Sequence, residues 1–483
     1  MTGALLVVGT GSNVGKSTIV TGLVRILARR GVAVAPFKGQ NMALNAAVTV
    51  EGGEIGRAQA VQARAAWRDP SVLMNPILVK PTGPGRSQLV VLGKPAGELR
   101  AAAWLEGRRG LWPIVLDAFD ELRSSVDVVI AEGAGSAAEI NLLSGDLTNL
   151  ALAEARGVPA VLVGDVDRGG VFASIYGHYT VLPPSLARHL HGFVITKLRG
   201  DPGLLGPGVR ELEDRLATRC YGVVPWHEIA LPAEDSLVRH RATAPRAPGQ
   251  LRVGVVALPH LANETDLDPL VAEGVALSWI DDPSRLSGVD LVIVPGSKAT
   301  VADLGWLRAS GIAAALEDHL REGGWLLGIC AGYQMLVDVI DDPVESGEGT
   351  VAGLGLVRGR VRFGPEKVLA LVEGSLRWPE AASVRGYLMH HGRVVSEEEP
   401  FVALGDGQLE GARRGRILAT AVHGILDDDR ARRALLEAVA EDRGRTLPPP
   451  VAFAAYQEAR IDEVADLLEE HLALDALWGL LGS

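Results

Sequence analysis

The feature of this chain that most constrains its fold is a glycine-rich turn, G-T-G-S-N-V-G-K-S-T, at residues 9–18. An apolar run at residues 5–8 precedes the turn, and an amphipathic segment at residues 19–30 follows it. This order predicts a buried strand, a tight turn and then a helix. Backbone N–H groups exposed by such glycines, together with the positive end of a helix, bind phosphate oxygens. The turn therefore predicts an α/β domain with a site for a polyphosphate.

Two side chains of the turn have chemistry suited to a nucleotide. We expect Lys16 to reach the outer phosphates and the Ser17 hydroxyl to hold Mg²⁺. The usual G-x-x-x-x-G-K-[ST] pattern fails by one residue, because Thr10 stands five positions before Gly15. The G-T-x-S-x-V-G-K-[ST] form instead resembles the loop of dethiobiotin synthetase and its relatives. The residues expected to contact ATP in this turn are Gly11, Asn13, Gly15, Lys16, Ser17 and Thr18.

Length and charge narrow the range of partners. A chain of 483 residues is too long for one hydrophobic core, so two or three domains are expected. Its 47 basic and 59 acidic residues include no basic block, which argues against nucleic acid or an anionic membrane surface as a partner. The apolar runs end well short of the roughly 18 residues that span a bilayer, and the first leads directly into the turn. We therefore expect a cytoplasmic protein that acts on small molecules, with its oligomeric state left open.

The first half of the chain alternates short β-type runs with helical stretches, as in a parallel sheet covered on both faces. The expected strands lie at residues 4–9, 32–36, 126–132, 160–164, 192–196 and 222–225. Polar residues follow the strand ends, with Lys38 after the second, Glu132 at the end of the third and Asp165 after the fourth. A carboxylate in this position can hold Mg²⁺ beside nucleotide phosphates, although it can also cap a helix. We predict that Ser17 and Glu132 hold the metal and that Lys38 lies in the same site.

A change of composition at residues 239–250, where Ala, Pro, Arg and Gly replace any periodic pattern, predicts a linker. It would separate an ATP-dependent synthetase domain at residues 1–238 from a second α/β domain at residues 251–440. Residues 441–483 are expected to form a C-terminal helical extension. The predicted fold class is thus α/β, with two domains that each contain a mostly parallel sheet flanked by helices.

The second domain contains the pattern G-I-C-A-G at residues 328–332, between a predicted strand at 325–329 and a predicted helix at 333–339. Glycines on both sides allow the sharp turn that exposes a nucleophile, and the N–H groups after it bind an oxyanion. We expect Cys330 to be a reactive thiol. The Ala331 N–H and a second N–H at Gly296, in P-G-S-K after another strand, would form the oxyanion site.

A thiol of this kind needs a base, and His423 follows an apolar strand expected at residues 417–422. His390 and His391 are competing candidates, but adjacent residues of a strand point to opposite faces, so at most one of them can face the site. Cys220 has no comparable setting and is expected to be a small core residue. The two cysteines are too isolated in the sequence to indicate a disulfide framework or a cysteine zinc site.

A phosphate loop that can activate a carboxylate and a thiol that can open an amide, present in one chain, indicate glutamine-dependent amidation. Over about residues 5–423 the chain resembles the cobyric acid synthase family of the cobalamin pathway. The most specific stretches are P-F-K-G-Q-N-M at 36–42, E-I-G-R-A-Q at 54–59, M-N-P at 74–76, K-P-T-G at 80–83, A-E-G-A-G-S-A-A-E-I-N-L at 131–142, G-D-V-D-R-G-G-V-F at 164–172 and P-G-S-K at 295–298. A sister family, cobyrinic acid a,c-diamide synthase, carries P-F-K-x-G-P-D at the first of these and stays as an alternative.

The resemblance implies a dethiobiotin-synthetase-like domain followed by a class I, flavodoxin-like glutamine amidotransferase domain. It implies that ATP, Mg²⁺ and glutamine are used to convert the b, d, e and g carboxylates of adenosylcobyrinic a,c-diamide into amides. By that likeness Cys330 attacks the glutamine carboxamide with His423 as base. The acceptor carboxylate, activated as an acyl phosphate at the Lys16 and Lys38 site, then takes up the ammonia.

The chain departs from the usual patterns of these families in four places. Most class I amidotransferases have a glutamate two residues after the histidine, where this chain has Ile425, so the group that orients His423 is not identified from the sequence. The others are Leu388 and Met389 in place of E-I, Thr196 in place of asparagine and Ala299 in place of asparagine. Two other function classes stay open: a phosphate-loop ATPase that has no use for Cys330, and a cysteine hydrolase with a degenerate nucleotide domain.

Overall fold

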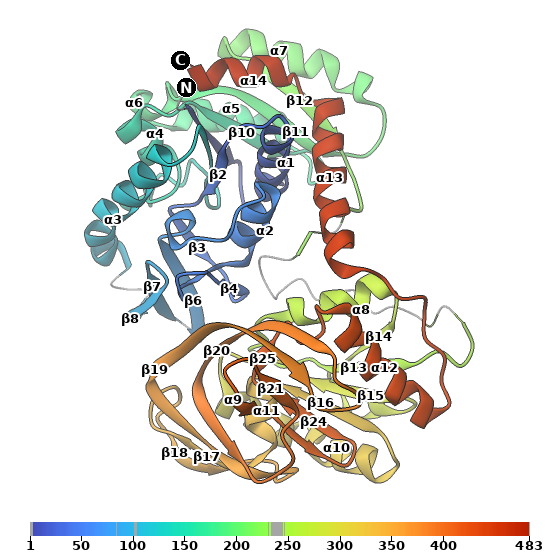
Figure 1. Cartoon of the computed structure of the whole chain (residues 1–483). Coiled ribbons are helices and arrows are strands. Elements are labelled where there is room, and N and C mark those ends of the chain that lie inside the picture. Colours follow the sequence, from blue (N-terminus) through green and yellow to red (C-terminus); the bar gives the residue numbers. More distant parts are fainter. Residues whose placement is uncertain are drawn as a thin grey trace. The chain divides into compact units, whose positions relative to one another are not determined.

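The computed structural model (Figure 1) describes residues 3–83, 85–100, 104–229, 231–232, 245 and 247–482. It divides into two compact units. Unit 1 comprises Met1–Ala43, Thr49–Pro232 and Gln457–Ser483, and unit 2 comprises Leu44–Val48 and Ala233–Tyr456. Most of the linker expected at 239–250 lies outside the described residues. In the described part of the chain, no helix is both long and apolar enough to cross a bilayer.

Unit 1 is built on a sheet of six parallel strands in the order β12-β11-β10-β1-β9-β2. All six strands expected from the sequence are present, as β1 (Gly3–Gly9), β2 (Val34–Phe37), β9 (Val128–Glu132), β10 (Ala160–Asp165), β11 (Leu190–Leu198) and β12 (Cys220–Pro225). Leu6 and Val8 of β1 pack into one core cluster, whereas Leu5 and Val7 pack into another. This alternation confirms that the sheet is covered on both faces.

Helices cover this sheet, and a second small sheet lies in the same unit. The helices are α1 (Lys16–Arg29), α2 (Arg57–Ala65), α3 (Trp104–Ser124), α4 (Leu150–Arg156), α5 (Val171–Val181), α6 (Pro184–Ala187) and α7 (Gly206–Leu216). The small sheet has the order β3-β6-β7-β8, formed by β3 (Gln40–Met42), β6 (Ile77–Gly83), β7 (Arg86–Val91) and β8 (Lys94–Arg100). No strands were expected in this region from the sequence.

The C-terminal segment returns to unit 1. Helix α13 (Phe453–His471) and helix α14 (Leu474–Trp478) follow α12 (Asp429–Arg443), and the residues from Gln457 onward belong to unit 1. Arg29 of α1 pairs with Asp466 at 2.5 Å, and Leu468 is fully buried in the cluster that contains Leu23. A Cβ at Gly22 would lie 2.5 Å from Leu468 Cδ1, so the helices approach closely there. Of the residues expected to form an extension, those up to Tyr456 belong to unit 2, and those from Gln457 onward complete the core of unit 1.

The main sheet of unit 2 has the strand order β14-β13-β15-β16-β24-β23. Its strands are β13 (Arg252–Val256), β14 (Ala276–Ile280), β15 (Leu291–Val294), β16 (Trp325–Ile329), β24 (Ile417–Thr420) and the antiparallel edge strand β23 (Ala412–Arg414). The parallel strands follow the order 2-1-3-4-5 of flavodoxin-like folds, as predicted. The helices of this unit are α8 (Asp268–Glu273), α9 (Thr300–Ala309), α10 (Ile312–Arg321), α11 (Ala331–Leu336) and α12.

A second, mostly antiparallel sheet in unit 2 was not anticipated. It runs β18-β17-β19-β20-β25, formed by β17 (Val337–Asp342), β18 (Gly349–Ala352), β19 (Val357–Leu376), β20 (Ser383–Ser396) and β25 (Val422–His423), with β21 (Val402–Leu404) and β22 (Leu409–Glu410) beside it. The helix predicted at 333–339 was wrong at its end, because Val337 begins β17 and pairs with β19.

The strand predicted at 417–422 is also divided between the two sheets. Strand β24 ends at Thr420, and Val422 already belongs to β25. The cause is Glu410, whose carboxylate accepts the Thr420 hydroxyl at 2.5 Å and the Ala421 N–H at 2.7 Å. This contact turns the chain between the sheets and places His423 on the second one.

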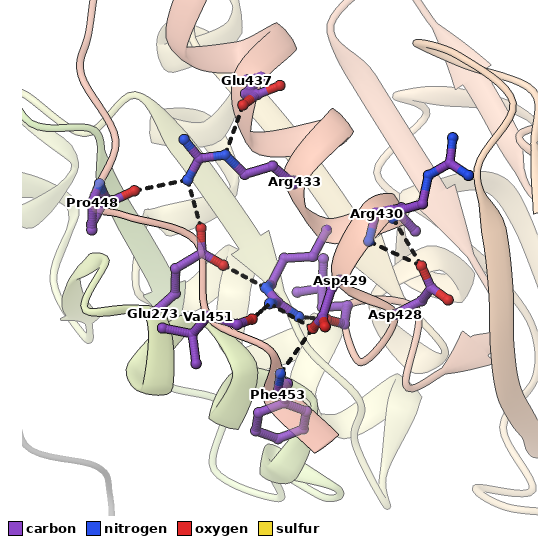
Figure 2. Close-up of polar contacts among 12 residues, drawn as sticks. Glu273, Asp428, Asp429, Arg430, Arg433, Glu437, Pro448, Val451 and Phe453 are labelled. Atoms are coloured by element: carbon purple, nitrogen blue, oxygen red, sulfur yellow. Dashed lines mark hydrogen bonds and ion pairs between the residues drawn. The ribbon is translucent and has the colours of Figure 1, made fainter. Parts of the chain in front are cut away.

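Figure 2 shows a buried ionic cluster that holds the end of unit 2 together. Glu273 of α8 is fully buried and accepts hydrogen bonds from Arg432 Nε at 2.6 Å and from Arg433 at 2.8 Å. The same two arginines donate to the carbonyls of Val451 and Pro448. The cluster therefore fixes the segment between α12 and α13 on α8.

Candidate active sites

The glycine-rich turn of unit 1 lies between β1 and α1, as predicted. Helix α1 begins at Lys16, three residues earlier than expected, so Lys16, Ser17 and Thr18 form its first turn. The helix starts early because Gly15 adopts φ 98°, which a residue with a side chain rarely does, and ends the loop there. Asn13 also has a positive φ, 60°. This geometry directs loop N–H groups and the helix N-terminus toward one place, as phosphate binding requires.

Lys16 lies across the loop. Its Nζ donates to the carbonyls of Gly11 at 2.7 Å and Gly135 at 3.0 Å, and the residue is buried. The loop is held from the other side by Thr196, whose hydroxyl lies 2.7 Å from the Val14 carbonyl. Thr196 is one of the departures noted in the sequence, and its hydroxyl has a clear local role.

Glu132 is the centre of the polar cluster in unit 1. Its Oε1 accepts hydrogen bonds from Ser17 Oγ and from Lys38 Nζ, both at 2.9 Å, and its Oε2 accepts one from Gln62 Nε2 at 2.6 Å. Burial alone would raise the pKa of Glu132, but the charge of Lys38 and the hydrogen bonds bring it below its ordinary value. The carboxylate is therefore ionised at neutral pH, and the structure brings Ser17, Lys38 and Glu132 together.

The residues present fit a magnesium ion. Within the described residues, no group of three or more His, Cys, Asp or Glu side chains could hold a metal by itself. Mg²⁺ prefers one or two protein oxygens together with substrate phosphates and water, rather than a full protein cage. The Ser17 hydroxyl and the Glu132 carboxylate, in contact beside the phosphate loop, are such a pair.

Polar side chains between residues 54 and 80 make three kinds of contact in unit 1. Gln62 belongs to the Glu132 cluster, because its side chain donates to Glu132 Oε2. Asn75 instead satisfies the backbone, since it donates to the carbonyls of Lys38 and Ile77 and accepts the Gly56 N–H. Lys80 and Glu54 form a buried ion pair at 2.5 Å. These contacts hold the segments that surround the first site.

In unit 2, Cys330 stands at the sharp turn between β16 and α11, as expected. It has φ 53° and ψ −110°, a strained conformation for a residue with a side chain. A Cβ at Gly332 would lie 1.9 Å from the Val294 carbonyl oxygen, so the turn requires glycine there. The strand, the strained cysteine and the glycines form the elbow that presents a nucleophile.

His423 lies beside this elbow and is almost fully buried. Its Nδ1 is 2.7 Å from Asp266 Oδ2, and its ring stacks on Tyr387 with centroids 5.1 Å apart. Burial alone lowers the pKa of His423, but the charges of Asp266 and Cys330 and their hydrogen bonds outweigh it and raise the pKa to about 10. The histidine is therefore an imidazolium at neutral pH, paired with an acid on one side and the thiol on the other.

Asp266 was missed by the sequence analysis. It lies in the 3₁₀ turn η5 (Glu264–Leu267), which follows β13, while the expected position was two residues after His423. Ile425, at that position, is fully buried among apolar side chains. Glu132 is the last residue of its strand, but Asp266 lies ten positions beyond the end of β13, so the strand-end signal that identified Glu132 does not single out Asp266.

The competing histidines lie on β20. His391 Nδ1 is 3.1 Å from the Gly364 carbonyl, whereas His390 lies near His423. Burial, together with the charge of His423, lowers the pKa of His390 to about 4, so it is neutral. Gly296 is close to the catalytic pair, because a Cβ there would lie 3.2 Å from His423 Cε1.

Both halves of the chain match known family models. Residues 5–238 match the CobQ/CobB/MinD/ParA nucleotide binding domain, and residues 252–431 match the CobB/CobQ-like glutamine amidotransferase domain. A cobyric acid synthase of Rhodococcus jostii is 49% identical over 100% of this chain and 96% of its own length. Cobyric acid synthases of Mycolicibacterium paratuberculosis (49%) and Streptomyces coelicolor (46%) each match 100% of this chain and 97% of their own.

The chain belongs to the cobyric acid synthase family. Each family model covers one of the two sites, with the Lys16 and Glu132 cluster in the first and Cys330, His423 and Asp266 in the second. The predicted family, the fold class and the glutamine-dependent amide ligase class are thereby confirmed.

The structure shows the local contacts of two residues, Met389 and Ala299, that depart from the usual family pattern. Met389 lies at the thiol, since its carbonyl is 3.9 Å from Cys330 Sγ. Ala299 follows the P-G-S-K turn, and its N–H donates to the Ser297 hydroxyl at 2.9 Å, so the backbone contact there needs no asparagine side chain. Neither departure alters the residues that carry the chemistry.

Cys220, the other cysteine of the chain, is not part of the Cys330 and His423 site. It is half-buried at the start of β12 and packs against the core of unit 1, as expected. Burial raises the pKa of its thiol to about 11. It is therefore protonated at neutral pH and is a packing residue.

Proposed function

We propose that this protein is a cobyric acid synthase. It amidates the b, d, e and g carboxylates of adenosylcobyrinic a,c-diamide to give adenosylcobyric acid, using ATP and glutamine at each step. The observation that carries the proposal is the full-length likeness to cobyric acid synthases in a chain that holds both a strained Cys330 beside His423 and an ionised Glu132 at a phosphate loop. A plain ATPase has no use for the Cys330 and His423 site, and a plain cysteine hydrolase has none for the Glu132 site at the phosphate loop.

In the glutaminase half-reaction, Cys330 Sγ attacks the carboxamide carbon of glutamine. The N–H groups of Ala331 and Gly296 take the developing oxyanion. The His423 imidazolium gives its proton to the departing nitrogen, so that ammonia leaves and a thioester stays on Cys330. Water then hydrolyses the thioester to glutamate and regenerates the thiol. The sequence prediction made His423 a general base, and its raised pKa makes it the proton donor first.

In the synthetase half-reaction, the acceptor carboxylate attacks the γ-phosphorus of ATP and ADP leaves. Ammonia attacks the resulting acyl phosphate, and phosphate leaves as the amide forms. Lys16 and Lys38 offset the charge that shifts onto the phosphate oxygens, and loop N–H groups hold them in place. Ser17 and Glu132 would hold Mg²⁺, which neutralises charge on the β- and γ-phosphates.

The direct test supplies ATP and Mg²⁺ to the purified protein and varies the other substrates. We expect ATP hydrolysis only when both a corrinoid acid and a nitrogen source are present, with the amidated corrinoid identified by mass spectrometry. ATP hydrolysis in the absence of both the corrinoid acid and the nitrogen source would support the ATPase alternative. Amidation of cobyrinic acid at its a and c carboxylates alone would support the sister family.

The base assignment is tested by comparing two histidines. His423→Ala should lower glutaminase activity by at least about a hundredfold, because a general acid–base group typically contributes 10² to 10⁴ in rate. His390→Ala should be milder, since burial and the charge of His423 lower the pKa of His390 to about 4 and keep it neutral. Steady-state glutamate release measures both, and the reverse ranking would transfer the role to His390.

The cytoplasm is the proposed location. The reaction uses ATP and glutamine, and both cysteines are free thiols, as is usual for proteins of reducing compartments.

A further inference from the structure

We propose that Asp266 is the positioning residue of the glutaminase site, and that it holds the His423 ring from a turn far upstream in the chain. This inference deepens the proposed function and rests on it. The Asp266 carboxylate touches the histidine but is not adjacent to it in sequence, and Ile425 occupies the position where most class I amidotransferases have their acid.

One oxygen of the Asp266 carboxylate contacts the His423 ring, and the other contacts the backbone of the next residue. Oδ2 lies 2.7 Å from His423 Nδ1, and Oδ1 accepts the Gly424 N–H at 2.8 Å. A carboxylate at Nδ1 keeps a proton on that nitrogen and leaves Nε2 for the thiol. The second hydrogen bond fixes the backbone immediately after the histidine. Together they set both the tautomer and the orientation of the ring.

The turn that carries Asp266 is itself held in place. The Asp266 N–H donates to the Asn263 carbonyl at 3.1 Å, and Asn263 adopts a left-handed conformation with φ 55°. The Asn263 side chain accepts the Ala46 N–H at 3.0 Å, and its Nδ2 lies 3.5 Å from His423 Nε2. Asp266 therefore faces the histidine from a hydrogen-bonded turn of unit 2, and solvent has little access to its carboxylate because Asp266 is only 4% exposed.

The strand order explains how distant segments meet here. The Asp266 turn follows β13, Gly296 follows β15 and Cys330 follows β16. These are the carboxyl ends of neighbouring parallel strands, and β13 and β15 flank the point where the strand order reverses. Ligand sites of open α/β sheets form at that point.

Among the described residues, charged and titratable groups that face His423 come from η5, the elbow and β20. They are Asp266 on η5, Cys330 on the elbow, and Tyr387 and His390 on β20. Asp266 is the acid in this set, so it is the group that stabilises the His423 imidazolium beside Cys330.

The test is Asp266→Asn, which keeps the shape of the side chain and removes its charge. Glutaminase kcat should fall by about 10²-fold or more, with a smaller change in KM, since asparagine cannot stabilise the imidazolium. The alkaline limb of the pH profile, where His423 loses its proton, should move to lower pH. Asp266→Glu should restore part of the rate. Amidation from ammonium should be unchanged.

Asp290→Asn is the matched control. Asp290 is also fully buried in unit 2, where it binds the Arg252 N–H at 3.0 Å and Arg445 Nε at 2.9 Å. It lies just before β15, at the opposite edge of the sheet from the site. This variant removes a buried carboxylate of similar structural importance, and its glutaminase pH profile should match that of the wild type.

A measurement that does not depend on catalysis is needed in case a variant has lost activity for structural reasons. Iodoacetamide labelling of Cys330, located by mass spectrometry, reports the thiolate. At neutral pH, labelling should be slower in Asp266→Asn than in wild type and Asp290→Asn. Wild-type labelling and an unshifted pH profile in Asp266→Asn would overturn the positioning role alone. Absence of glutaminase activity in the wild-type protein would instead overturn the proposed function.

Discussion

Cys330→Ser should abolish glutamine-dependent amidation while amidation from ammonium persists. The thiol is the group that opens the carboxamide, and removal of a covalent nucleophile can cost on the order of 10⁶-fold in kcat. Serine keeps the turn but offers a hydroxyl that is far less nucleophilic at neutral pH. The measurement is amide formation with glutamine and, separately, with a high concentration of ammonium at alkaline pH.

The ammonium arm is the control for the fold of the variant. The synthetase site of unit 1 uses none of the residues around Cys330, so its rate with ammonium should be close to that of the wild type. Loss of both activities would contradict the proposed division of labour between the two units. Cys220→Ser, which changes a packing residue with a raised pKa, should leave both activities nearly unchanged.

Lys16→Ala should suppress amidation from glutamine and from ammonium alike. Lys16 lies on the first turn of α1 and reaches over the loop to Gly11, where the outer phosphates of ATP would lie. Charge shifts there as the γ-phosphoryl group passes to the carboxylate, so the loss is felt in the transition state. Removal of one such contact typically costs on the order of 10² to 10³ in rate, or roughly 3 to 4 kcal/mol.

The Lys16→Ala protein is assayed for amide formation beside glutamate release. Glutamate release should continue but should no longer be coupled to amide formation, because the thiol chemistry uses no phosphate. The affinity for the corrinoid should change less than kcat. Near-normal amidation from either nitrogen source would rule out this loop as the ATP site. The contrast with Cys330→Ser, which spares the ammonium reaction, separates the two sites functionally.

The local chemistry of both sites could be predicted from neighbouring residues in the chain. A strand, a glycine-rich turn and a helix are adjacent in the chain, so the placement of Lys16 and Ser17 follows from neighbouring residues. The same holds for Cys330, whose elbow depends on the glycines two residues to each side of it. Strand ends of a parallel sheet lie at one edge, which is why Glu132 and Lys38 could be assigned to the phosphate loop before their contact was known.

The tertiary structure alone decided which distant residues complete these sites. Asp266 reaches His423 across 157 positions, and Gln62 reaches Glu132 across 70, with no spacing rule to indicate either contact. The second sheet of unit 2 and the return of α13 to unit 1 were equally hidden. Hydrophobic patterns identify which face of a strand or helix is buried, but not which partner covers it. That choice depends on packing between elements, and only the folded chain brings those elements together.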